Sequence, residues 1–175
     1  SLRRSVKQHD ILRFLGQWVK PDKEERLDES LIYYTCGAET WQQTCQWPPA
    51  GIRFQPFYFS PEQRLLPSPP ESPGEDIYAV DFRATSGEYN RWWELGVAKR
   101  RSVDYGDRAG QSEFVLAYET EPLERDVEIT GSPVLTLYVD SSEPDCSFFA
   151  YLEDVCLDGR ILCIGEGQLR AIHRR

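Results

Sequence analysis

The sequence predicts an all-β fold, a sandwich or barrel of short strands, preceded by one amphipathic helix. Residues 5–20 place apolar side chains at helical spacing, whereas the chain after Pro21 alternates apolar and polar residues in short runs separated by turn residues. Of the 175 residues, 40% are hydrophobic and 13% aromatic, a composition typical of an ordered globular protein. We therefore expect one domain with its own core and a short helical appendage.

The helix is expected over residues 5–20, "SVKQHDILRFLGQWVK". Its apolar stripe consists of Ile11, Leu12, Leu15, Trp18 and Val19. Lys20-Pro21 should end it, because the residue before a proline disfavours the helical conformation. A single helix beside a strand-rich chain has little of its own to bury against. We therefore expect residues 1–30 to be a terminal helix and linker that belong with a neighbouring domain.

The rest of the chain contains short β-rich runs that we expect to form strands. These runs are 31–35, 52–59, 77–82, 113–118, 126–130, 133–140, 147–155 and 160–171. Residues 61–75 contain five prolines and should form a surface connection. Residues 83–112 should form a long loop around "NRWWELG". Loops longer than about 15 residues inside a compact domain tend to be functional or disordered, and the paired tryptophans favour function.

The stretch "SFFAYLEDVCLDGR", residues 147–160, suggests a metal loop, a pair of catalytic acids or a turn. Asp158-Gly159 predicts a two-residue hairpin turn between the last two strands, because Gly and Asp tolerate the positive φ that such turns need. Glu153 and Asp154 are neighbours on a strand, so they point to opposite faces and cannot share a proton or a metal. The turn is therefore the favoured interpretation.

The motifs of a catalytic chain are missing from this sequence. Nucleophilic hydrolysis needs a nucleophile, a base and an orienting group, yet the sequence holds only two histidines, His9 and His173, and no G-x-S-x-G elbow. It also holds no glycine-rich phosphate loop and no H-E-x-x-H. The sequence predicts no catalytic residue, no metal ligand and no cofactor.

Charge and cysteine usage limit the partners. The net charge of −9 argues against nucleic acid or an anionic membrane, because both attract clustered Lys and Arg. No run approaches the roughly 18 apolar residues of a membrane span. The five cysteines lack C-x-x-C spacing, which predicts reduced thiols in a cytoplasmic protein.

Residues 118–175 carry four motifs, "PLERDVEITG", "DSSEPD", "FFAYLEDVCLDGR" and "EGQLRAIHRR". In this order and spacing they closely resemble the C-terminal β-sandwich of the CocE/NonD hydrolases, a cocaine esterase-like family related to the X-prolyl dipeptidyl-peptidases. The run "RFLGQWVK" resembles the last helix of that family's α/β-hydrolase domain. Residues 37–51 resemble the bridge into the sandwich.

The resemblance implies that residues 31–175 form a jelly-roll (galactose-binding-like) β-sandwich. Family members continue beyond the "LRAIHRR" motif, so we expect a sandwich truncated at its C-terminus, whose open sheet edges favour self-association. The Ser, Asp and His triad of the family lies in the hydrolase domain and matches no position here. The chain alone is expected to be inactive, and its parent is expected to be a serine hydrolase of esters or amides, X-Pro peptides included.

In that family the sandwich packs on the α/β-hydrolase domain, which is the expected partner, and helps to wall the acyl pocket. We expect Trp92, Trp93 and Leu95 to form that wall, while the alternative is that the tryptophans only cap the sandwich. A carbohydrate-binding module is a second hypothesis, because Trp41, Trp47 and the loop tryptophans could stack on pyranose rings.

Overall fold

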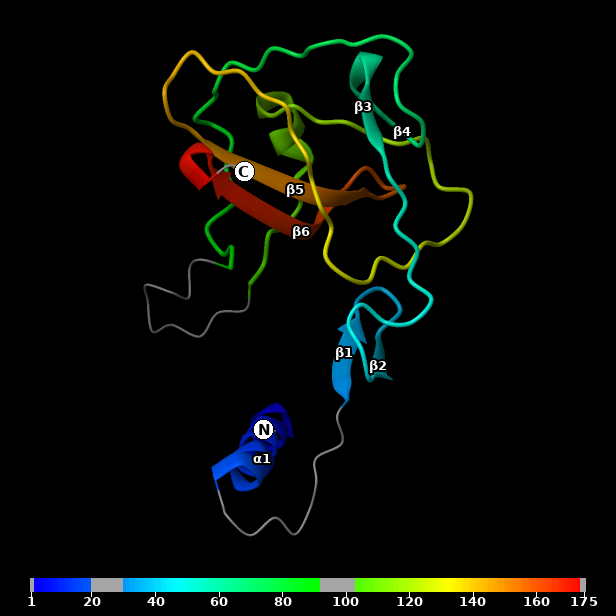
Figure 1. The fold of residues 1–175 in the computed structure, drawn as a ribbon, viewed down its shortest axis with the longest axis vertical. Coiled ribbons are helices and arrows are strands. Elements are labelled where there is room, and N and C mark those ends of the chain that lie inside the picture. The colour runs from blue at the N-terminus through cyan, green and yellow to red at the C-terminus, as the bar shows by residue number, and fades with distance from the viewer. Residues whose placement is uncertain (1, 20–29, 92–102, 174–175) are drawn as a thin grey trace. The chain divides into compact units, whose positions relative to one another are not determined.

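The computed structural model describes residues 2–19, 30–91 and 103–173. Its helix is α1 (Leu2–Val19). Its strands are β1 (Leu31–Thr35), β2 (Thr40–Thr44), β3 (Tyr58–Ser60), β4 (Arg64–Leu66), β5 (Ser147–Val155) and β6 (Ile161–Arg170). Its short 3-10 helices are η1 (Pro61–Gln63), η3 (Ala109–Phe114) and η4 (Ala171–His173). Within these residues the strands pair as three two-stranded antiparallel sheets (Figure 1). The structure is therefore β-rich, as predicted.

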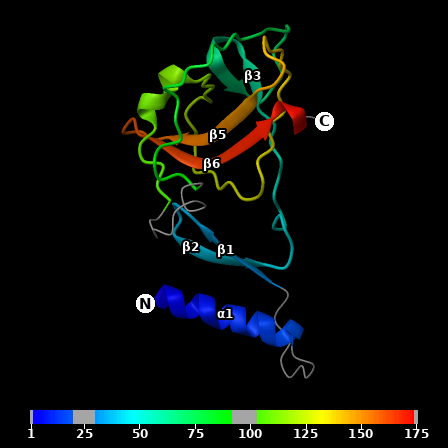
Figure 2. The same ribbon diagram turned by 90° about the vertical axis from the view of Figure 1, so that its left-hand side faces the viewer.

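The chain divides into two compact units. The first comprises Ser1–Phe54 and Arg125–Leu135, and the second comprises Gln55–Glu124 and Thr136–Arg175. The first unit contains α1 and the β1–β2 hairpin; the second contains the two other strand pairs (Figure 2). Helix α1 confirms the predicted helix, and it ends at Val19, before the Lys20-Pro21 pair that was expected to stop it.

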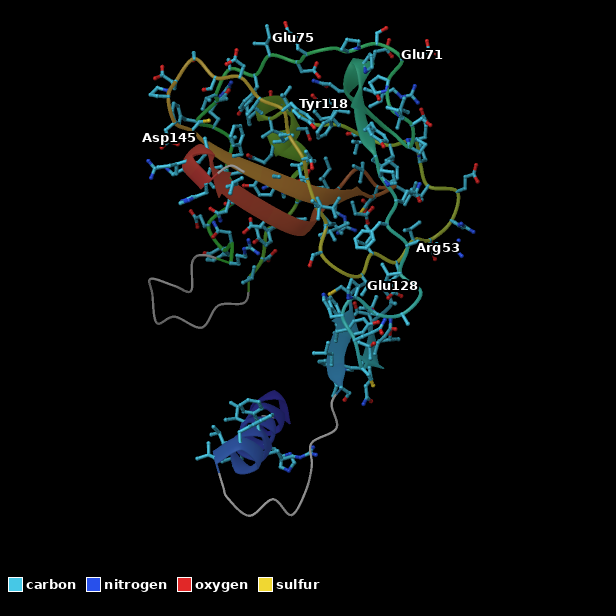
Figure 3. The ribbon with its side chains drawn as sticks, viewed as in Figure 1. Arg53, Glu71, Glu75, Tyr118, Glu128 and Asp145 are labelled. Atoms are coloured by element: carbon cyan, nitrogen blue, oxygen red, sulfur yellow. The ribbon has the colours of Figure 1, made fainter. Side chains whose placement is uncertain are left out.

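In the first unit, β1 and β2 run antiparallel from the Leu31–Thr44 pair to the Thr35–Thr40 pair. One face of this hairpin contacts the segment that follows residue 124. There, the Glu128 carboxylate accepts a hydrogen bond of 3.0 Å from Gln42 Nε2 (Figure 3). The opposite face carries Tyr34 and Trp41, both exposed. The hairpin thus has one face with polar contacts and one aromatic face open to solvent.

In the second unit, β5 and β6 form the longest ladder of the described residues, from Ser147–Arg170 to Val155–Ile161. This confirms the predicted hairpin, but the turn is longer than expected. Gly159 N donates to Cys156 O (2.9 Å) and Cys156 N donates to Arg160 O (2.8 Å), which leaves three residues in the loop. Gly159 takes the left-handed conformation at φ 86°. A type I turn followed by a left-handed glycine is the common three-residue solution.

Several predicted strands are absent from the described residues. The runs 77–82, 126–130 and 133–140 pair with no neighbour, and 113–118 begins inside η3 instead. Alternation shows which side chains could share a face, but a strand also needs a neighbour for its backbone hydrogen bonds. In the part of the chain that the structure describes, Tyr138 is 98% exposed rather than packed between layers.

The region around β3 and β4 also differs from the expectation. Only the end of the run 52–59 is a strand, since β3 begins at Tyr58. Its partner, Arg64–Leu66, lies inside the proline-rich segment predicted to be a surface connection. The Leu65 N–H donates to Glu119 O at 2.7 Å, which ties this pair to the chain near Tyr118 (Figure 3). The Tyr118 hydroxyl donates to Asp76 Oδ2 at 2.6 Å, and burial raises the pKa of Tyr118 to about 12.

Candidate functional site

Three residues, Trp92, Trp93 and Leu95, were predicted to contact substrate, and all three lie outside the described residues. The structure does describe the chain on both sides of residues 92–102. We call Tyr89, Arg91, Asp104 and Tyr105 the loop neck. All four residues of the loop neck lie in the second unit.

The loop neck is closed by backbone pairing. Tyr89 and Asp104 form an antiparallel bridge, in which Asp104 N donates to Tyr89 O at 2.9 Å. Beyond the bridge, the Asp104 carboxylate accepts from Gly106 N at 2.8 Å, which turns the chain away from the neck. The Tyr105 hydroxyl accepts from Arg91 N at 3.4 Å. Tyr89 and Asp104, on the two sides of residues 92–102, therefore lie side by side.

An ion pair ties the loop neck to strand β6. Arg91 Nε lies 2.7 Å from Glu166 Oε1, and Arg91 Nη2 donates to the Glu166 carbonyl at 3.3 Å. The Glu166 side chain is 8% exposed and that of Arg91 is 46% exposed. Glu166 Oε1 is buried, so the guanidinium of Arg91 compensates a carboxylate charge that is largely removed from solvent. Burial, and secondarily Glu166, raises the pKa of Tyr105.

A β-bulge places Glu166 on the same face of the β5–β6 hairpin as Cys163. Cys163 pairs with Glu153 and Glu166 pairs with Tyr151, so Ile164 is an extra residue without a partner. Tyr151 and Glu153 are two apart on β5 and share a face. We call the face made by Tyr151, Glu153, Cys163 and Glu166 the polar face.

Arg108 lies over the polar face and is the most buried charged residue described, with a side chain that is 4% exposed. Its guanidinium pairs with Glu153, lies 4.0 Å from the centre of the Tyr151 ring, and donates to Thr85 O at 3.0 Å. Its backbone N donates to Ile161 O at 2.9 Å. One residue thus joins the chain after the loop neck to both strands of the hairpin.

Asp107 extends this attachment along the edge of β6. Its Oδ1 accepts from Ile161 N and from Ala109 N, both at 3.0 Å. These two backbone hydrogen bonds, led by that from Ile161, lower the pKa of Asp107. A carboxylate that accepts two N–H groups is stabilised in its charged form. The start of β6 is therefore covered by the Asp107-Arg108 pair.

Cys163 is the thiol of the polar face. Burial raises its pKa, Glu153 and Glu166 raise it further, and Arg108 lowers it. A thiol with a raised pKa holds little thiolate near neutral pH, so Cys163 is a poor nucleophile.

The charged side chains near the polar face are engaged in ion pairs with one another. Each of the two arginines near the polar face is paired with a carboxylate, Arg91 with Glu166 and Arg108 with Glu153. His9 is exposed on α1 and His173 is exposed on η4, in different units. Among the described residues there is no group of three or more His, Cys, Asp or Glu that could hold a metal ion.

The sequence interpretation missed Arg91, Arg108 and Glu166, although one signal was present. Glu153 shares a strand face with the large side chains of Phe149 and Tyr151. A carboxylate in such a position requires a cation nearby, because a buried charge is tolerated only when it is paired. That argument calls for an arginine, but it does not identify which one.

The tryptophans of the first unit have aromatic neighbours. The rings of Trp41 and Tyr34 are 5.0 Å apart on the open face of β1–β2, and those of Trp47 and Tyr33 are 5.5 Å apart. Beside the first pair, the Glu39 carboxylate accepts from the Tyr34 hydroxyl and from Gly37 N. These bonds lower the pKa of Glu39, with that from Tyr34 contributing most.

Comparison with known proteins gives one family and several relatives. The model of the X-Pro dipeptidyl-peptidase C-terminal non-catalytic domain matches residues 23–175. A provisionally named serine esterase of Mycobacterium bovis is 39% identical over 169 residues, which is 95% of this chain and 26% of the relative. A Mycobacterium tuberculosis protein of the same description has the same identity and coverage.

Cocaine esterase of a Rhodococcus species is 28% identical over 157 residues, which is 81% of this chain and 26% of the relative. The chain thus spans about a quarter of the length of the curated relatives that it matches. No solved structure matches the chain significantly. In the described residues, no helix is long and apolar enough to cross a membrane.

Proposed function

Because the chain belongs to the family of X-Pro dipeptidyl-peptidase C-terminal non-catalytic domains, we propose that it is the accessory domain of a serine esterase. In this proposal the domain packs on an α/β-hydrolase domain that carries the Ser, Asp and His triad, and it helps to shape the acyl pocket. The supporting observation is the family match over residues 23–175, together with relatives named as serine esterases. Their remaining three quarters leave ample length for a catalytic domain.

Trp92, Trp93 and Leu95 are the residues that we propose to line the acyl pocket. What supports them is the loop neck: the backbone bridge at Tyr89 and Asp104 and the ion pair to Glu166 give the segment between them a fixed base. Large apolar side chains carried on such a base are suited to excluding water from an acyl group.

Two experiments test the accessory role. The isolated chain should not turn over p-nitrophenyl esters or X-Pro anilides, and it should not react with a fluorophosphonate probe, whereas the full-length parent should do both. Stoichiometric labelling of a serine in the isolated chain would overturn the proposal. In the parent, Trp92→Ala should raise the KM of bulky acyl esters more than that of acetyl esters. An equal increase in KM for all acyl sizes would show that Trp92 only packs within the domain.

The finer architecture is part of the same proposal. We propose that the strand pairs belong to a jelly-roll sandwich, which the three antiparallel pairs are compatible with. The unpaired thiols of all five cysteines support the proposed cytoplasmic location. Self-association through open sheet edges is also proposed, and light scattering that shows only a monomer would rule it out.

A carbohydrate-binding module is the second candidate, and the observation that favours it is the open Trp41–Tyr34 pair. Trp41 is 73% exposed beside the Glu39 carboxylate, a combination that suits a sugar ring and its hydroxyl groups. Retention of the chain on a polysaccharide matrix, lost in Trp41→Ala, would support this function over the esterase role.

A further inference from the structure

We propose that Trp41, Tyr34 and Glu39 form a binding site for a small quaternary ammonium compound, a cation of the choline type that carries one trimethylammonium group. The site lies on the β1–β2 hairpin, within the first unit. It does not depend on the esterase role or on the acyl pocket. Its ligand belongs to a different class from the sugar of the second candidate function, so the experiment must separate the two.

Two aromatic rings supply the main contact surface of this site. Tyr34 of β1 pairs with Trp41 of β2, and their ring centroids are 5.0 Å apart at an interplanar angle of 57°. Trp41 is 73% exposed, so a ligand can reach its ring. Ile32, which is 67% exposed, shares a strand face with Tyr34 and extends the apolar surface. The face of an aromatic ring attracts a cation within about 6 Å of its centre, and tryptophan does so most strongly.

The Glu39 carboxylate supplies a full negative charge beside these rings. Its Oε2 accepts from the Tyr34 hydroxyl, and its Oε1 accepts a hydrogen bond of 3.1 Å from Gly37 N. The first contact places the carboxylate at the hydroxyl end of the Tyr34 ring. The two hydrogen bonds, with that from Tyr34 contributing most, lower the pKa of Glu39, so the carboxylate is charged near neutral pH.

The backbone of Glu39 is held in an unfavourable conformation. Its φ is 53°, in the left-handed region, where glycine or asparagine is the usual residue. Glycine would therefore fit this turn with less strain than glutamate does. Residues held in such conformations cluster at functional sites, which agrees with a binding role for the Glu39 side chain.

The hydrogen bonds of Glu39 favour a quaternary ammonium over a sugar. Each carboxylate oxygen already accepts a hydrogen bond from the protein, which leaves fewer positions for the directional hydrogen bonds of sugar hydroxyls. A quaternary ammonium has no N–H group, so it needs only charge and apolar contact. Its methyl groups can lie on the Trp41 ring while the Glu39 carboxylate balances its charge. The net charge of −9 also favours a cationic ligand over an anionic one.

A second aromatic pair of the same unit provides a matched control. The rings of Tyr33 and Trp47 are 5.5 Å apart, but the Tyr33 hydroxyl donates to the amide oxygen of Gln42 at 3.1 Å. The Gln42 amide nitrogen in turn donates to Glu128 Oε1 at 3.0 Å. The tyrosine hydroxyl of this pair therefore contacts a neutral amide, whereas that of the proposed site contacts a carboxylate. A cation should distinguish the two pairs.

The first experiment titrates the 175-residue chain with choline chloride at constant ionic strength and follows the tryptophan indole N–H signals by NMR. The Trp41 signal should shift with a dissociation constant of about 1 to 10 mM, because exposed cation–π contacts are individually weak. The Trp47 signal should stay unchanged. Equal shifts of the two signals, or no shift of Trp41, would overturn the proposal.

A neutral ligand of the same shape tests the role of charge. In the carbon analogue of choline, a quaternary carbon replaces the nitrogen, so the apolar surface is kept and the charge is removed. This alcohol should bind roughly tenfold more weakly than choline or not at all, because the attraction to the rings and to Glu39 is electrostatic. Equal affinities for the two compounds would overturn the proposal, because they would show a purely apolar contact.

Substitutions assign the site to its residues, with binding followed by saturation transfer to the choline methyl protons. Trp41→Ala and Glu39→Gln should each weaken binding roughly tenfold, whereas Trp47→Ala should leave it unchanged. Trp41 and Glu39 are both exposed, so the variants should fold, and circular dichroism checks this. Equal weakening by Trp47→Ala, or unchanged binding in Glu39→Gln, would overturn the proposal.

Two further ligands separate a free compound from other sources of the same contacts. Phosphatidylcholine vesicles should not retain the chain, because the phosphate beside each ammonium group is repelled by Glu39 and by the net charge of −9. Retention on the vesicles without a choline-induced shift of Trp41 would overturn the proposal. Retention on a polysaccharide matrix that is lost in Trp41→Ala, again without a choline-induced shift, would overturn it in favour of the carbohydrate-binding function.

Discussion

The hairpins β1–β2 and β5–β6 are both antiparallel, yet they are stabilised in different ways. In β1–β2 five residue pairs carry an aromatic face that is open to solvent. In β5–β6 nine pairs carry the polar face, which is covered by the paired arginines Arg91 and Arg108. The aromatic face of β1–β2 is exposed, whereas the charged side chains of β5–β6 make their ion pairs inside their own unit.

The two hairpins differ from the usual distribution of residues, because a charged side chain is buried in one and a large aromatic side chain is exposed in the other. Charged groups are normally exposed and large apolar groups buried, but here Arg108 is buried while Trp41 is not. Leaving a buried charge without its partner lowers the free energy of unfolding strongly, whereas removing an exposed ring lowers it little. Substitutions in the two hairpins should therefore differ in size.

The largest effect is expected for Arg108→Ala. It leaves the Glu153 carboxylate half-buried without a cation, and removal of one partner from a buried pair costs about 3 to 5 kcal/mol. Urea unfolding followed by circular dichroism measures this loss. Arg83→Ala is the control, because Arg83 is exposed and pairs with Asp81 in solvent, where a pair contributes less than about 1 kcal/mol. Similar losses in the two variants would contradict the assigned role of Arg108.

A smaller effect is expected at the turn of β5–β6. Gly159→Ala puts a side chain at φ 86°, and the left-handed conformation costs an L-residue about 1 to 2 kcal/mol. Gly165→Ala in the same hairpin is the control, because a Cβ there meets open space and its φ is not left-handed. The difference between their unfolding midpoints measures the strain. Equal midpoints would show that the turn relaxes.

Trp41→Ala should cost still less. It removes one cross-strand contact with Tyr34, a type of pair that contributes about 0.2 to 1 kcal/mol in an antiparallel sheet. Trp41→Phe keeps a ring at this position and should recover most of the loss. A cost for Trp41→Ala as large as that for Arg108→Ala would show that the aromatic face is covered within the chain.

The smallest change concerns thiol reactivity and needs no substitution. Cys36 and Cys45 are exposed, whereas burial and the carboxylates of the polar face raise the pKa of Cys163. Iodoacetamide at pH 7.5 should therefore modify Cys36 and Cys45 before Cys163, as followed by mass spectrometry of peptides. Raising the pH should speed modification of Cys163, because it increases the thiolate fraction. Early labelling of Cys163 in the folded protein would contradict the burial of the polar face.

The sequence predicted the helix and the β5–β6 hairpin because both depend on local signals. The apolar stripe of α1 and the Asp158-Gly159 turn each lie within one short stretch of sequence. The predictions of strands at 77–82 and 133–140 were wrong, because strand pairing depends on a neighbour distant in sequence, which the alternation of apolar and polar residues does not specify. The polar face was not predicted for the same reason, since Arg108 and Glu153 are 45 residues apart in the chain.

Ile164, the extra residue of the β6 bulge, makes β6 one residue longer than the stretch of β5 that it pairs with. In a regular strand, side chains three residues apart point to opposite faces, so Cys163 and Glu166 would lie on different faces. The bulge at Ile164 brings them to the same face. A version of this gene lacking the Ile164 codon would keep Cys163 opposite Glu153 and Glu166 opposite Tyr151 in an uninterrupted ladder. Bulges bend and twist the strand that holds them, so that shortened protein should retain both ion pairs while its hairpin tip points in a new direction.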